Sequence, residues 1–205
     1  MVRIICVYFL SCFFLMSYGQ LCNHHELSKT SDIKIEIKRI NRNPQMDSCV
    51  IKVAIFVKSS SKLIQEIQYC SEYIFGDAFS DCGNVRSFST HVNQDSVALD
   101  NDYGDIVIAD FNFDRKDDFA IKNNSGGNGG PEYRFYIRDA NGEFIFDKFL
   151  SEKMIYFPVR INNANRTLTT LVHANARQLT ETKYKLNPET RKWKMVKSRL
   201  LSANL

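Results

Sequence analysis

The chain has 205 residues, of which 44% are apolar and 24% are charged, and 27 Lys and Arg against 23 Asp and Glu give it a formal charge of +4. These values are typical of a globular protein of one domain, and they exclude collagen, coiled coils, disordered tails and polytopic membrane proteins. The small positive surplus does not by itself indicate a nucleic-acid-binding protein.

The first 19 residues are predicted to be a signal peptide. Arg3 supplies a positive charge, residues 4–16 form an almost unbroken apolar run, and residues 17–19 end in the small residues that signal peptidase reads. We expect cleavage after Gly19, which leaves residues 20–205 as a single β domain, periplasmic or secreted. The apolar run is too short for a good membrane-spanning helix, so we expect no membrane span.

Apolar residues of the remaining chain recur mostly at every second position, which is the period of a β-strand. Residues 106–109 (Ile-Val-Ile-Ala) are continuously apolar, which predicts a central strand buried on both faces. Residues 139–142 (Asp-Ala-Asn-Gly) and 187–190 (Asn-Pro-Glu-Thr) predict tight turns. The strands are predicted, in chain order, at residues 33–37, 50–57, 63–67, 106–109, 119–121, 133–137, 144–146, 168–172, 184–186 and 193–196.

No segment predicts a helix of more than about two turns. The fold class expected from this pattern is all-β, in the form of a single antiparallel β-sandwich-like domain.

Four cysteines remain after the leader, namely Cys22, Cys49, Cys70 and Cys82. Their even number in an exported chain, without paired CxxC spacing, predicts structural disulfides rather than a zinc site. Three pairings are possible from the sequence. The short segment between Cys70 and Cys82 favours that pair, which leaves Cys22 with Cys49.

Residues 110–118 (Asp-Phe-Asn-Phe-Asp-Arg-Lys-Asp-Asp) carry side-chain oxygens at positions 1, 3, 5 and 9. This spacing is typical of a loop that wraps calcium, with a backbone carbonyl at position 7. Arg115 replaces the usual glycine at position 6, and the usual glutamate at position 12 is absent, so the missing ligand is expected from water, Asp102 or Asp105. The alternative is an acidic turn whose carboxylates face water. The predicted calcium ligands are Asp110, Asn112, Asp114, Lys116 and Asp118.

A glycine-rich stretch, residues 123–133 (Asn-Asn-Ser-Gly-Gly-Asn-Gly-Gly-Pro-Glu-Tyr), follows directly. Such a cluster binds phosphate when it opens a helix, but Pro131 and the alternation of Tyr133, Phe135 and Ile137 predict a strand here. The alternatives that remain are a hairpin tip without a role and a protruding loop that enters a partner's cleft. The predicted partner-binding residues are Ser125, Gly127, Asn128, Gly129, Gly130 and Tyr133, with Tyr133 as the aromatic anchor.

No other pattern indicates catalysis, and we expect no enzyme. The chain lacks a Gly-x-Ser-x-Gly elbow, and its histidines, His24, His25, His91 and His173, have no fixed carboxylate or cysteine spacing around them. The basic residues within 191–199 alternate with apolar ones, which favours the solvated face of a strand over a nucleic-acid patch.

The acidic turn at 110–118, followed by Gly129-Gly130-Pro131-x-Tyr133 and an aromatic strand and hairpin, resembles a family of exported bacterial immunity proteins over about residues 103–150. Members known from Xanthomonas inhibit a lysozyme-like effector of the type IV secretion system, and their fold is like that of the periplasmic inhibitor of invertebrate-type lysozyme. The resemblance implies a β-sandwich-like domain, calcium bound to the acidic turn, and loops that plug a muramidase cleft.

From these observations together we expect an exported calcium-binding protein that binds and inhibits a lysozyme-like peptidoglycan hydrolase, in immunity or defence. The alternative is a non-inhibitory envelope interaction module in which calcium only stabilises the fold.

Overall fold

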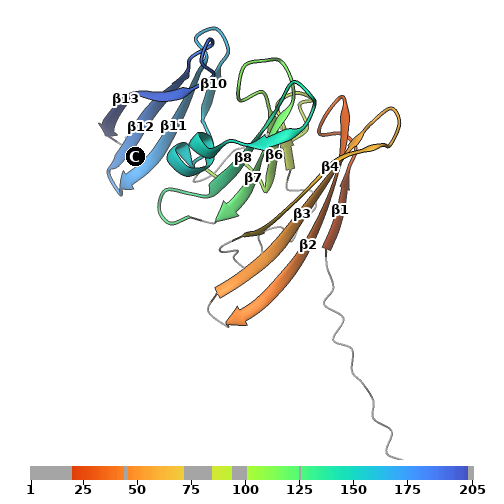
Figure 1. Ribbon diagram of the computed structural model, residues 1–205. Helices are drawn as coiled ribbons and strands as arrows, with labels where there is room; N and C mark the ends of the chain where they lie inside the picture. Colours follow the sequence, from red (N-terminus) through yellow and green to blue (C-terminus); the bar gives the residue numbers. More distant parts are fainter. Residues whose placement is uncertain (1–19, 44–45, 72–84, 94–100, 125, 203–205) are drawn as a thin grey trace, which may run out of the picture.

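The computed structural model of the chain describes residues 20–43, 46–71, 85–93, 101–124 and 126–202. Within these residues, thirteen strands form three sheets, and the all-β, sandwich-like fold predicted from the sequence is confirmed (Figure 1). The predicted leader, Cys82 and Ser125 lie outside the described residues.

The first sheet is fully antiparallel and runs in chain order. Ile33, Ile35 and Ile37 are buried, while the charged residues between them are exposed, as the period of two requires. Its strands are β1 (Gln20–His24), β2 (Ser31–Asn43), β3 (Met46–Val57) and β4 (Leu63–Ser71).

The central sheet is buried on both faces. Ile106 and Ile108 pack against the first sheet, while Val107 and Ala109 pack into a second apolar cluster on the opposite face. The prediction that residues 106–109 form a central strand is therefore confirmed. The strands of this sheet are β5 (Val85–Ser87), β6 (Ile106–Ala109), β7 (Asp118–Asn124), β8 (Glu132–Arg138) and β9 (Phe144–Phe146), and only β5 and β6 are parallel.

The third sheet covers the other face of the central sheet, together with a single π-type helical turn, η1 (Leu150–Met154). Leu168 and Tyr184 from this sheet pack with Phe111, Phe135 and Phe157 in the second cluster. The sheet consists of β10 (Arg160–Asn162), β11 (Thr167–Asn175), β12 (Gln178–Leu186) and β13 (Trp193–Ser202). The result is three layers with the central sheet between the other two (Figure 1).

The predicted disulfide pairs Cys22–Cys49 and Cys70–Cys82 are both wrong. Cys49 and Cys70 carry thiols, and Cys22 is disulfide-bonded to neither of them. In the first sheet Cys22 lies opposite Ile35 and Cys49 lies opposite Arg39, on the two sides of β2. Two strand spacings and four residues of offset separate their Cα atoms by roughly 16 Å. A disulfide tolerates at most about 7 Å, so the pair cannot form.

Among the described helical segments, none is long and apolar enough to cross a membrane.

Candidate functional site

The acidic turn joins β6 to β7, and its side chains bond mainly to its own backbone. Asp110 Oδ1 accepts a hydrogen bond from Asp114 N (3.0 Å), and Asp110 Oδ2 accepts one from Arg115 N (2.8 Å). Arg115 has a φ of 67°, the left-handed conformation that glycine usually supplies at position 6 of such a loop. The arginine therefore does not prevent the sharp turn.

The next two predicted ligands are tied to each other. Asn112 Oδ1 accepts from Asp114 N, and Asn112 Nδ2 donates to Asp114 Oδ2, both at 3.0 Å. Asp114 Oδ1 accepts from Lys116 N (3.0 Å), while the ammonium of Lys116 donates to Asp139 O (2.9 Å). Arg191 Nη2 lies 3.8 Å from Asp114 Oδ2 and partly balances its charge.

Asp118, at the start of β7, is fully buried and holds the turn to β8. Its Oδ2 accepts from Phe111 N (2.8 Å) and Asn112 N (3.3 Å), and its Oδ1 accepts from Arg138 N (2.8 Å). Burial raises the pKa of Asp118 to about 8; the backbone N–H bonds oppose this rise, and the charges of Asp114 and Asp110 add to it.

The donor set of the turn suits calcium, because it consists of carboxylate, amide and carbonyl oxygens. Burial also raises the pKa of Asp110, with a smaller contribution from Asp114, so a cation here would favour the charged form of both groups. In the part of the chain that the structure describes, however, no three His, Cys, Asp or Glu side chains are arranged to hold a metal ion. The turn thus has oxygen ligands of the kind that calcium prefers. In this structure, however, those oxygens already accept hydrogen bonds from backbone amides.

Asp102 and Asp105, the two candidates besides water for the missing calcium ligand, are engaged elsewhere. Both form ion pairs with Lys122 Nζ, at 2.9 Å and 2.8 Å. Lys122 is buried, so it needs both carboxylates as partners. These two aspartates therefore belong to a structural ion-pair network.

Hydrogen bonds hold the described part of the glycine-rich loop, residues 126–130, at its base. Gly126 has a φ of 63°, and a Cβ placed on it would lie 1.8 Å from Gly130 O, so only glycine fits there. Gly126 N donates to Asn124 Oδ1 (2.8 Å), and Gly130 N donates to Gly127 O (3.0 Å). Asn101 Nδ2 donates to Gly129 O (3.0 Å), which attaches the loop to a neighbouring segment.

The loop also rests on the third sheet. A Cβ on Gly129 would lie 2.7 Å from Tyr156 Oη and 3.0 Å from Val172 Cγ1, so the absence of a side chain lets the loop approach β11 closely. At the tip, Gly127 and Asn128 are exposed, and a Cβ on Gly127 would contact nothing within 4 Å. The loop therefore has a braced base and an open tip.

A shallow depression of about 450 Å³ lies beside this tip. It is formed by Gly127 and Asn128 on one side and by His173, Asn175 and Ala176 from the β11–β12 hairpin on the other. The predictions from sequence missed this hairpin as part of a site. The only sequence signal was His173, one of the four histidines without fixed carboxylate or cysteine spacing. Nothing in the sequence shows which loops the sheets bring together.

Tyr133 is not an aromatic anchor for a partner. Its side chain is 1% exposed and packs in the second apolar cluster. Its hydroxyl accepts from Tyr103 N (3.1 Å) and donates to Gly104 O (2.9 Å). Gly130 is buried as well, so the surface that remains from the predicted partner-binding set is Gly127 and Asn128, with half-buried Gly129.

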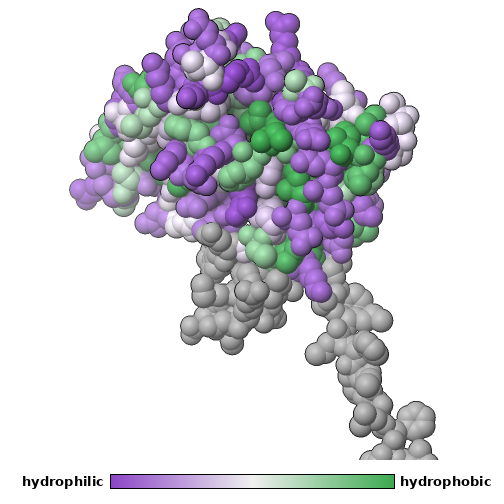
Figure 2. All heavy atoms as spheres, in the orientation of Figure 1, coloured by the Kyte–Doolittle hydropathy of each residue, from purple (hydrophilic) through white to green (hydrophobic). Residues whose placement is uncertain are grey.

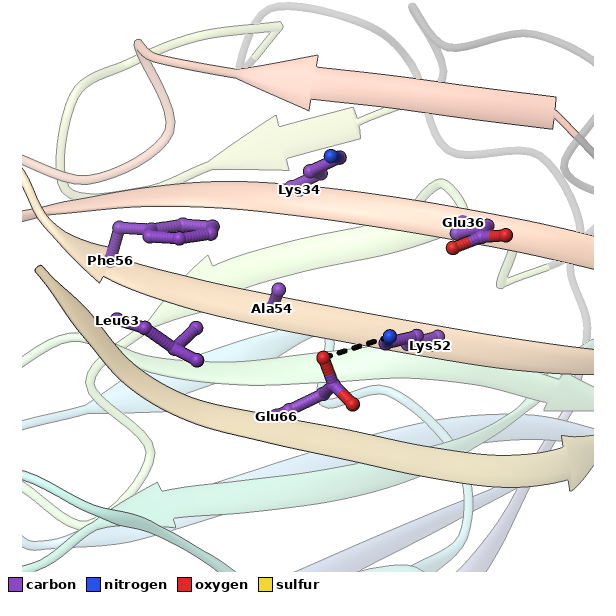
Figure 3. Close-up of a pocket in the computed structure, with 7 residues that line it drawn as sticks. All are labelled: Lys34, Glu36, Lys52, Ala54, Phe56, Leu63 and Glu66. Carbon is purple, nitrogen blue, oxygen red and sulfur yellow. Dashed lines mark ion pairs between the residues drawn. The ribbon is translucent and has the colours of Figure 1, made fainter. Parts of the chain in front are cut away.

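A second hollow, of about 140 Å³, lies on the outer face of the first sheet (Figure 3). Lys52 Nζ and Glu66 Oε2 form an ion pair across it at 2.9 Å. Phe56 and Leu63 line one end, and Lys34 and Glu36 come from β2. Acidic and basic side chains alternate here as on an ordinary solvated sheet face, so we propose no binding or catalytic role for this hollow.

The comparisons with known proteins yield a likeness of fold. No family model matches the chain, and no curated protein matches it. Its structure is similar to a solved structure described as that of a Xanthomonas type IV secretion system related protein, with a TM-score of 0.59 and 15% sequence identity. The similarity covers 91% of this chain and 89% of the other. The fold is thus shared with a secretion-system-related protein along nearly its whole length.

Proposed function

We propose that this protein is an exported binding protein, without catalytic activity, that inhibits a lysozyme-like peptidoglycan hydrolase by inserting the tip of the glycine-rich loop into the partner's cleft. The sequence supports this through its resemblance to exported immunity proteins around residues 103–150. The fold shared with a secretion-system-related protein is compatible with an envelope role.

The observation that carries the proposal is the form of the loop. Its base is held by Asn101, Asn124 and the contact of Gly129 with Tyr156 and Val172, while its tip has no large side chain. A loop already held in one conformation loses little conformational entropy on binding. Small residues also allow its backbone to enter a narrow cleft.

The chemistry of the tip suits a cleft lined with carboxylates. The Asn128 side chain offers two N–H donors to a carboxylate and one carbonyl acceptor to a protonated acid. His173 and Asn175, across the depression from Asn128, supply further polar contacts at the rim of such an interface.

Calcium on the acidic turn is part of the same proposal, with Asp110, Asn112, Asp114 and the carbonyl of Lys116 as ligands and Asp118 at the base. Bound calcium would supply positive charge among these carboxylates. The hydrogen bond from Arg138 N to Asp118 Oδ1 holds the start of β7 against β8. Burial raises the pKa of Asp110 and Asp118, and a cation bound beside them would favour their charged forms.

The test is to titrate residues 20–205 against lysozymes of the several structural types and against lysozyme-like domains of secreted effectors. We expect a stoichiometric complex with at least one of them and a loss of muramidase activity that follows complex formation. A complex without inhibition would favour the non-inhibitory envelope module instead. The absence of both complex and inhibition across the panel would overturn the proposal.

A further inference from the structure

The third sheet ends in a long strand whose outer edge is not paired within the described residues. β13 spans ten residues and follows β12 in the sheet order, with no strand on its other side (Figure 1). All of its residues are at least partly exposed. A long unpaired edge offers a row of backbone N–H and C=O groups to another extended chain.

One face of this edge is basic. On β12, Lys183 and Lys185 alternate with the buried Thr182, Tyr184 and Leu186, so the two lysines lie on the face turned away from the core. Lys197 lies opposite Lys183, and Lys194 lies opposite Lys185, which places all four lysines together on that face. The part of the molecule formed by β10–β13 is largely hydrophilic in the view of Figure 2.

Two like-charged pairs placed directly opposite each other destabilise a sheet, so the fold itself gains nothing from them. None of these four lysines forms an ion pair with another described residue. The neighbouring Arg160 and Arg199 share the single carboxylate of Glu181, at 2.7 Å and 2.8 Å, so this trio also carries a net positive charge. Of the four lysines, Lys183 also lies within electrostatic reach of Glu181. This face therefore carries a surplus of positive charge, beside a backbone edge that no described strand pairs.

The opposite face of β13 exposes two large apolar side chains. Met195 and Leu200 lie opposite Tyr184 and Thr180 and are 61% and 60% exposed. Long edge strands usually carry lysines that prevent pairing with another copy, because two basic edges repel each other. The same lysines attract a strand of opposite charge.

We propose that β13 is a docking edge for an extended acidic segment of a partner protein, which adds to the third sheet as an extra strand. The segment would have acidic residues at every second position, facing Lys194 and Lys197, and apolar residues between them, covering Met195 and Leu200. Backbone hydrogen bonds supply the affinity in this mode of recognition, and the alternating side chains supply the specificity. This docking edge is separate from the glycine-rich loop and does not depend on the proposed inhibition.

The test uses a fluorescent peptide of about nine residues with Glu at alternate positions and Val or Leu between them, and measures binding to residues 20–205 by anisotropy at physiological salt. A peptide of the same composition without the alternation is the first control. Two further peptides carry N-methyl groups on one or the other set of alternate amides, because an added strand uses only one set.

We expect the alternating peptide to bind at least tenfold more tightly than the shuffled one, and only one N-methylated peptide to lose binding. The double variant Lys194→Glu, Lys197→Glu should weaken binding at least tenfold, whereas Lys29→Glu with Lys62→Glu, exposed lysines near the first sheet, should change it less than twofold. Circular dichroism confirms that both variants fold.

No binding by the alternating peptide would overturn the proposal. Equal binding of all four peptides, or of single-stranded DNA, would also overturn it, because it would show a general polyanion surface rather than a strand-pairing edge.

Discussion

The acidic turn and the glycine-rich loop are close in sequence and flank the same strand, β7, yet they use their polar groups in opposite ways. In the acidic turn, carboxylates point to backbone amides, and Asp118 is fully buried. In the glycine-rich loop, the uncharged side chains of Asn101 and Asn124 and one backbone bond hold the base, and the tip faces solvent with Gly127 and Asn128.

The difference shows that the density of charged residues in a sequence does not measure their accessibility. The residues with the strongest chemical signal stabilise the connection between β6, β7 and β8. The tip of the glycine-rich loop, with Gly127 and Asn128, is exposed. Substitutions in the turn should therefore affect stability first, and substitutions at the tip should affect binding first.

The largest effect is expected for Asp118→Ala. The change leaves three N–H groups without their acceptor, those of Phe111 and Asn112, which are buried, and that of Arg138, which is partly buried. Each unsatisfied buried group costs about 1 to 3 kcal/mol. We expect the free energy of unfolding to fall by more than about 3 kcal/mol, measured by denaturant titration. Glu143→Ala, at an exposed carboxylate, is the control and should have little effect. A loss below about 1 kcal/mol for Asp118→Ala would contradict the structural role given to this carboxylate.

The next largest loss of stability is expected at the base of the glycine-rich loop, and a substitution at its tip serves as the control. Gly126→Ala forces a side chain into a left-handed backbone and against Gly130 O, which should cost about 1 to 3 kcal/mol. Gly127→Ala is the matched control, because its Cβ would meet nothing within 4 Å. Equal melting temperatures for the two variants would show that the base is not as rigid as described.

A similar or smaller effect is expected from calcium. We expect calcium to bind weakly. At millimolar concentrations that exceed its dissociation constant, calcium should raise the free energy of unfolding by about 1 to 3 kcal/mol. Asp114→Asn removes a charged ligand and should abolish this increase, while magnesium at the same concentration should give much less. Calorimetry and thermal melts check both statements. If the melting temperature of the unaltered protein changes with neither calcium nor chelator, calcium is excluded from the proposal.

Much of the fold follows from the sequence because alternation of apolar residues decides which residues face a core. The strand at 106–109 and the pairs of strands joined by turns at 139–142 and 187–190 are examples. The strands β1, β5 and β10 were not predicted, because these short segments show no clear alternation of apolar and polar residues.

The candidate site was predicted only in part. Tyr133 alternates with Phe135 in the manner of a strand, but the sequence does not show that the third layer covers that face of the central sheet. For the same reason the β11–β12 hairpin was missed as a neighbour of Asn128. Contacts between distant segments depend on how the sheets stack, and no local pattern encodes this.

The most direct test of the central claim is inhibition of the partner hydrolase by Gly127→Tyr, compared with Asn141→Tyr in another exposed turn. A tyrosine at position 127 has room in the isolated protein but widens the tip that must enter the cleft. The account predicts that Gly127→Tyr weakens inhibition at least tenfold without a change in melting temperature, while Asn141→Tyr inhibits as the unaltered protein does. Full inhibition by Gly127→Tyr would contradict it.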